Sequence, residues 1–128
     1  MQYLLAISVD ETLPMPSPGE PGFAEMAAGW AEYNRALHAA GVLVDGSQLA
    51  PSLSATTVRF AVGTTPTTLD GPFVEAKEQL AGYYRIRAAD LDAALEWASR
   101  MPIPFGRVEV RPIVMAPGPD GAPTPVID

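Results

Sequence analysis

The chain of 128 residues contains no cysteine and a single histidine, His38. Without thiols it can form no disulfide, use no cysteine nucleophile and bind no zinc through thiolates. One histidine excludes a histidine-rich metal site, and the acidic residues lack the alternating Asp spacing of a calcium loop. We therefore expect neither a metal nor another cofactor.

Positive charge is also scarce, with eight Lys and Arg against 15 Asp and Glu, which gives a net charge of -7. Nucleic acids and anionic membranes are bound through clusters of cations, and these eight are scattered along the chain. The glycine-rich motifs that cradle nucleotide phosphates are missing as well. We predict no nucleic-acid partner and no membrane partner.

Long hydrophobic runs are absent. The first apolar run ends at Asp10, which is too short for a membrane span or for a signal peptide with its cleavage site. The composition, 48% hydrophobic and 18% charged, is that of a globular chain. We predict a cytoplasmic protein with one domain over residues 1–115 and a Pro- and Gly-rich tail over residues 116–128.

Hydrophobic periodicity predicts helices over residues 23–40 and 90–100. It predicts strands over residues 2–9, 42–49, 54–62, 79–87 and 107–115, with a further short strand over 67–70. Asp90 is the expected N-cap of the second helix, and Gly41 the expected C-cap of the first. On the second helix we expect Leu91, Ala94, Leu95 and Ala98 to face inward.

This order of elements predicts a ferredoxin-like α+β fold, in which two helices cover one face of a mostly antiparallel sheet. Two helices of this size leave the other face of the sheet bare. We expect Tyr3, Phe60 and Tyr83 to line that face. A second copy of the sheet is its simplest cover, so we expect a homodimer.

The stretch DGPFVEAKEQLAGYY, residues 70–84, resembles the signature of the YCII-related family, specifically of its DGPF branch. Similar blocks are WAEY, AAGVL, ATTVR, LDAALEWA and VEVRP, which start at residues 30, 39, 55, 91 and 108. The resemblance implies a dimeric ferredoxin-like α+β barrel in a bacterial protein. It also implies an association of the branch with extracytoplasmic-function sigma factors.

The wider YCII-related family carries a His-Asp pair proposed as catalytic. When the blocks ALHAAG and WASRMP are aligned with the family, the two positions fall on Trp30 and Met101. His38 lies eight positions after Trp30 and does not replace the family's histidine. The resemblance therefore favours a non-catalytic regulatory module that binds a small-molecule ligand or a sigma-factor-type protein.

The candidate pocket or functional cluster consists of Trp30, Tyr33, Arg59, Asp70, Glu75, Lys77, Glu78, Tyr83, Glu109 and Arg111. Trp30 either packs in the core or lines an apolar pocket. Arginines on a sheet face either bind a ligand carboxylate with two hydrogen bonds or pair with acids of the chain. Lys77 either belongs to a site, where it pairs with a ligand carboxylate or with Glu109, or lies in a solvated loop or a salt bridge of the dimer.

Asp70 has two interpretations. The structural one makes it the first residue of a turn, whose carboxylate accepts from the backbone N–H groups ahead of it. The functional one is part of an alternative in which the protein is an enzyme. There Asp70 or Glu75 is the base, and Arg59 or Lys77 stabilises a developing oxyanion. In a third interpretation the charged stretch is a structural clasp of the dimer.

Overall fold

The computed structural model describes residues 1–126. Its helices are α1 (Phe23–Ala39) and α2 (Leu91–Ser99), and a single 3-10 turn, η1, covers Ser52–Ser54. The strands are β1 (Gln2–Asp10), β2 (Leu43–Gln48), β3 (Thr56–Arg59), β4 (Thr67–Asp70), β5 (Glu78–Arg87), β6 (Arg107–Ile113), β7 (Met115–Pro117) and β8 (Pro123–Pro125). Both predicted helices are confirmed to within one residue at each end.

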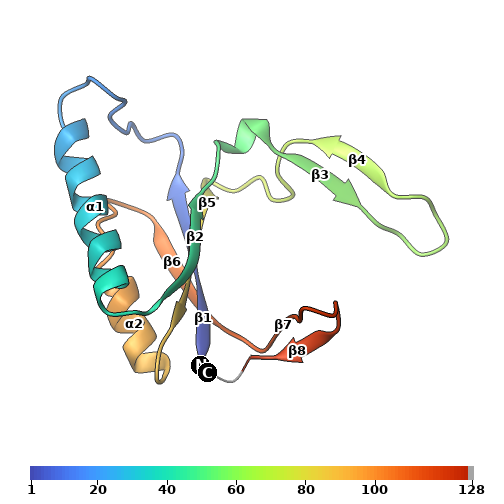
Figure 1. Cartoon of the computed structure of the whole chain (residues 1–128). Coiled ribbons are helices and arrows are strands. Elements are labelled where there is room, and N and C mark those ends of the chain that lie inside the picture. The colour runs from blue at the N-terminus through green and yellow to red at the C-terminus, as the bar shows by residue number, and fades with distance from the viewer. Residues whose placement is uncertain (127–128) are drawn as a thin grey trace.

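Four strands form the main sheet in the order β2-β5-β1-β6, and every neighbouring pair is antiparallel. Both helices lie on the same face of this sheet (Figure 1). The predicted α+β, ferredoxin-like arrangement is therefore confirmed. Pro112 fits because β6 is an edge strand, where a missing N–H leaves no neighbouring strand unpaired.

The ends of the helices form as local chemistry predicts. The Asp90 side chain accepts a hydrogen bond of 2.9 Å from the backbone N–H of Ala93. At the end of α1, Gly41 has a φ of 68°, and Val42 N–H donates to the carbonyl of Leu37 at 3.2 Å. This is the Schellman arrangement, in which glycine takes the left-handed position without steric cost.

The hydrophobic core lies between the sheet and the helices. Alternate residues of β1 supply Tyr3, Leu5 and Ile7, and Leu37 of α1 packs against them. The expectation that Tyr3 lines the opposite face is wrong, because the alternation of side chains along β1 places it with Leu5 in the core.

One prediction about the inward face of α2 is also wrong. Ala94 is fully buried, and Trp97 and Ala98 pack against the core. Leu91 and Leu95 are exposed instead. This helix has only nine residues and carries apolar side chains around much of its circumference, so periodicity did not select one face.

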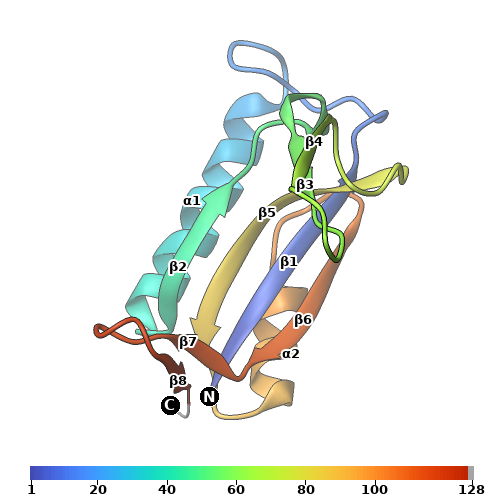
Figure 2. The ribbon, with the colours of Figure 1, turned by 90° about the vertical axis from the view of Figure 1, so that its right-hand side faces the viewer.

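Two hairpins project from the side of the sheet that the helices leave bare, which we call the open face. Figure 1 shows β3–β4 and β7–β8 extending to this side at opposite ends of the sheet, and Figure 2 looks onto the open face between them. The predicted strand 54–62 shortens to Thr56–Arg59, because β4 offers it only four partners. Phe60 therefore lies on the hairpin and not on the sheet.

The predicted C-terminal tail contains regular structure. Met115–Pro117 and Pro123–Pro125 pair as an antiparallel hairpin. Gly118 N–H donates to the carbonyl of Ala122 at 2.8 Å and closes the connecting loop. Residues 127 and 128 of the predicted tail lie outside the described part of the chain.

Candidate functional site

The candidate residues lie in three separate places. Trp30 and Tyr33 lie between the helices and the sheet. Arg59, Asp70 and Glu75 lie on the β3–β4 hairpin and the loop that follows it. Lys77, Glu78, Tyr83, Glu109 and Arg111 lie on or beside the open face. The sheet separates the first group from the other two, so Trp30 and the DGPF stretch do not line one site.

On the helix side, Trp30 belongs to a cluster of aromatic rings. Its ring stacks on Tyr84 with centroids 6.4 Å apart, and it meets Tyr33 edge-on at 6.1 Å. Tyr33 contacts Trp97 in the same edge-on way at 6.2 Å. The Tyr33 hydroxyl donates to the Trp97 carbonyl at 2.8 Å, and the Tyr84 hydroxyl donates to Asn34 Oδ1 at 2.5 Å. The geometry supports core packing for Trp30, because the rings pack against one another and both tyrosine hydroxyls have hydrogen-bond acceptors.

Burial gives this cluster a testable pH response. Desolvation, with a smaller contribution from the nearby Tyr84, raises the pKa of Tyr33 from 10.0 to about 12. The protonated hydroxyl is favoured in the folded state, so its stabilising effect is complete below pH 10 and is lost as the pH rises towards 12. We expect the free energy of unfolding to fall across this interval in denaturant titrations, together with a late phenolate absorbance step. Tyr33→Phe should diminish that step, although burial also raises the pKa of Tyr84, and an unchanged step would contradict the assignment.

The charged residues of the DGPF stretch pair differently from the prediction. Lys77 Nζ lies 3.7 Å from Asp10 Oδ2, not beside Glu109. Glu109 binds Nη2 of Arg111 at 2.7 Å, two positions along the same strand. The register between β1 and β5 explains the pairing with Asp10. Asp10 lies opposite Glu78 and is therefore next to Lys77. The alternative that paired Lys77 with Glu109 is therefore wrong.

Asp10 is the buried end of this ion pair. The Thr12 hydroxyl donates to Asp10 Oδ1 at 2.6 Å, and the Thr12 backbone N–H donates to the same oxygen at 2.9 Å. These bonds, the hydroxyl above all, and the Lys77 ammonium together hold the pKa of the Asp10 carboxyl below its usual range, although burial opposes them. The carboxylate thus anchors the end of β1 to the start of β5.

The open face carries a row of polar side chains across its middle. Arg85 on β5 and Arg111 on β6 are both register partners of Leu4, so the two arginines flank this leucine. Arg85 Nε donates to Oε1 of the buried Gln2 at 2.7 Å. The alternation along residues 83–87 predicts from the sequence that Arg85 lies on this face. No local pattern predicts that Gln2 accepts its hydrogen bond, because that contact depends on β1 lying next to β5 in the sheet.

The open face also holds Tyr83, as predicted for the lining of this face. Its register partners are Ala6 on β1 and Ser47 on β2. The Tyr83 hydroxyl donates to Asp45 Oδ2 at 2.9 Å. Asp45 was missed because the sequence places it in a short Asp-Gly stretch that is typical of a turn.

The turn at Asp70 and Gly71 is built by backbone contacts. Gly71 has a φ of 96°, and its N–H donates to the Ala55 carbonyl at 2.8 Å. Its own carbonyl accepts from the Thr57 hydroxyl at 2.7 Å. Within residues 1–126 we find no hydrogen bond or ion pair of the exposed Asp70 carboxylate. The predicted role of Asp70 as a side-chain acceptor in this turn is therefore wrong.

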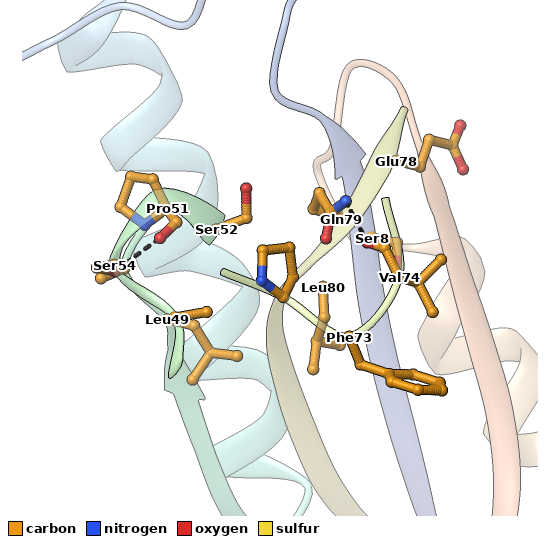
Figure 3. A pocket seen from close by; sticks show the side chains of 13 residues that line it. Ser8, Leu49, Pro51, Ser52, Ser54, Phe73, Val74, Glu78, Gln79 and Leu80 are labelled. Atoms are coloured by element: carbon orange, nitrogen blue, oxygen red, sulfur yellow. Dashed lines mark hydrogen bonds between the residues drawn. The ribbon is translucent and has the colours of Figure 1, made fainter. Parts of the chain in front are cut away.

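A pocket of about 560 Å³ lies beside this turn on the open face. Figure 3 shows Phe73, Leu80 and Leu49 around it. The residues that line it are Ser8, Leu49, Ala50, Pro51, Ser52, Ser54, Ala55, Pro72, Phe73, Val74, Glu78, Gln79 and Leu80. We call this the DGPF pocket.

Most polar groups of the DGPF pocket are already bonded within the chain. The hydroxyl of Ser52 donates to Glu11, and that of Ser54 donates to the Pro51 carbonyl, each at 2.7 Å. Gln79 Nε2 donates to two carbonyls of the DGPF loop, and Glu78 pairs with Arg107. What remains is mainly apolar surface, which suits an apolar occupant.

In the part of the chain that the structure describes, no group of three acidic or histidine side chains could hold a metal ion. Neither helix over residues 1–126 is long and apolar enough to cross a membrane. His38 is exposed near the end of α1, on the helix side of the sheet.

The fold and the open face define a small ferredoxin-like α+β protein. Residues 1–116 match the model of the YCII-related domain, and the chain belongs to the YCII-related family. It is also 43% identical, over 79 residues, to an uncharacterised protein of Rhizobium meliloti (strain 1021). The aligned stretch covers 59% of this chain and 63% of the relative, so the match spans less than two thirds of that protein.

Proposed function

We propose that this chain is a non-catalytic binding module of the DGPF branch that acts as a homodimer and binds a small molecule with an anionic group. The observation that carries the proposal is the open face. It is a four-stranded surface with a central polar row, left bare between two projecting hairpins.

The apolar side chains around the open face support the dimer. Large exposed apolar residues lie on the two hairpins, around the DGPF pocket and on the segments that join them to the sheet: Leu49, Leu53, Val58, Phe60, Val62, Leu69, Phe73, Val74, Leu80, Val114 and Met115. Soluble monomers rarely expose so many apolar side chains. A second copy covers them at once, because an isologous contact buries the same surface on both partners.

The surroundings of the catalytic candidates support a binding role. Trp30 packs in the aromatic cluster, and Met101, at the other position of the family's pair, is buried in the apolar core. Asp70 and Glu75 are exposed on the hairpin side of the sheet, and Lys77 is paired with Asp10. No observation brings a base and an oxyanion partner together, so the enzyme alternative gains no support.

The ligand class is proposed from Arg85 and Arg111. Both flank Leu4 on the open face, and a guanidinium presents a planar pair of donors that matches a carboxylate or a phosphate. Their donors are shared with Gln2 and Glu109, which an incoming anion would replace. Enclosure by a second sheet would strengthen these bonds by excluding water.

Light scattering combined with thermal-shift screening tests both parts of the proposal. We expect a dimer, and we expect some small carboxylates or phosphates to raise the melting temperature. Arg111→Gln should weaken the affinity of a hit by about 10- to 100-fold, because one charge-assisted bond is lost. Arg35→Gln, an exposed change on α1, is the matched control and should leave the affinity unchanged.

The outcomes separate the two parts. A monomer at all accessible concentrations would contradict the dimer. A dimer whose melting temperature no anion changes would contradict the ligand class alone. The link to sigma factors stays a prediction from the family resemblance.

A further inference from the structure

We infer that the tip of the β3–β4 hairpin, residues 60–62, occupies the DGPF pocket of a second copy of the chain. The inference rests on the proposed dimer and adds a reciprocal contact to it. Each copy would lend its hairpin tip to the other, so that the pocket at the DGPF turn is complete only in the dimer.

The hairpin needs a partner for its own stability. It consists of two four-residue strands, β3 and β4, and an isolated two-stranded hairpin is only marginally stable in water. It projects away from the sheet (Figure 1). Val58 and Leu69 are about half exposed along its length. Packing against another surface would bury these apolar side chains and stabilise the hairpin.

The tip presents apolar side chains from a defined turn. Thr64 N–H donates to the Ala61 carbonyl at 3.2 Å, and Gly63 takes a φ of 76°. This turn holds Phe60, which is 79% exposed, beside the fully exposed Val62. In a monomer these two apolar side chains would stay exposed to water at the end of the hairpin, which is unfavourable.

The DGPF pocket matches this tip in chemistry. Its volume of about 560 Å³ lies within the range of ordinary binding pockets. Its apolar walls include Leu49, Phe73 and Leu80, and most of its polar side chains are bonded within the chain. A charged metabolite would find few open donors there, whereas Phe60 and Val62 need none.

Charge also favours a second copy of this chain as the occupant. The hairpin carries two charged residues, Asp70 at its base and Arg59 towards its tip, so the end of the arm is cationic in a chain with a net charge of -7. The carboxylate of Glu11 lies at the rim of the pocket, because it accepts hydrogen bonds from the lining residue Ser52. A cationic end of the arm that approaches this carboxylate reduces the repulsion that two acidic chains would otherwise feel.

Cross-linking tests this contact directly, because the chain has no cysteine of its own. Two single variants, Val62→Cys and Phe73→Cys, are purified, mixed, left to exchange subunits and treated with a short bis-maleimide. We expect a covalent dimer that contains one copy of each variant. The control mixture replaces Phe73→Cys with Glu32→Cys, an exposed position on α1, and should stay uncross-linked.

A second measurement separates the contact from the dimer itself. Phe60→Ser should weaken dimerisation by at least about 100-fold, since two symmetric tips lose their apolar burial. Leu95→Ser, which changes an exposed leucine on α2, should leave the dimer constant unchanged.

The possible failures are distinct. A wild-type monomer would overturn the dimer and this inference together. A dimer that gives no Val62–Phe73 cross-link, or whose constant is unaffected by Phe60→Ser, would overturn only the placement of the tip. A cross-link from Val62→Cys to Met115→Cys, at the opposite end of the open face, would assign the tip to the β7–β8 hairpin and also overturn the placement.

Discussion

We expect Met101→Asp to lower the free energy of unfolding by about 4 kcal/mol, because it places an uncompensated carboxylate in the apolar core. Met101 is only 6% exposed and belongs to the core between the helices and the sheet. A typical domain has about 5–15 kcal/mol of stability, so this loss would leave the variant marginally folded. Urea unfolding measures it.

The matched control is Met15→Asp, in the loop before α1, where the methionine is 42% exposed. A change there should stay within about 0.5 kcal/mol, because water solvates the new charge. If Met101→Asp lost less than about 1 kcal/mol, position 101 would have access to water or to a cation. Position 101, one of the two positions of the family's proposed pair, would then be able to hold a carboxylate in this chain.

Gly106→Ala is expected to lower the free energy of unfolding by roughly 3 kcal/mol, since it combines backbone strain with a steric clash. Gly106 has a φ of 114°, which side chains rarely adopt. A Cβ at this position would also lie 2.3 Å from the Ser8 carbonyl oxygen and 3.2 Å from Val9 Cα. Both of those atoms are backbone of the central strand β1 and cannot yield.

Gly41→Ala provides the control for strain without a clash. Its φ of 68° is also positive, but a Cβ there would have no neighbour within 4 Å. We expect a loss of about 1 kcal/mol, the ordinary cost of a left-handed alanine. Equal losses for the two variants in denaturant unfolding would show that the contact of Gly106 with β1 adds nothing.

Much of the local structure was predictable because its causes are local. The bounds of α1 and α2 follow from periodicity, the Asp90 cap and the glycine that ends α1. The alternation of residues 83–87 placed Tyr83 and Arg85 on one face, as the register with β1 confirms. The family also followed from short sequence blocks, and the match over residues 1–116 confirms it.

The site was predictable only in part, because its residues are assembled by contacts distant in sequence. The charged stretch after Asp70 looked like one cluster. In the fold, Lys77 pairs with Asp10, and Glu78 pairs with Arg107. Such partners depend on which strands become neighbours and in which register, and no local pattern encodes that choice.

By itself, the sequence determined the composition limits, the helices and their caps, the alternation along the strands and the family. Each of these rests on neighbouring residues or on a linear motif. Only the tertiary structure decided that the sheet separates Trp30 from the DGPF turn and that two hairpins flank the open face. The reason is physical, because a side chain's surroundings are set by which elements pack together, and packing is a property of the whole chain.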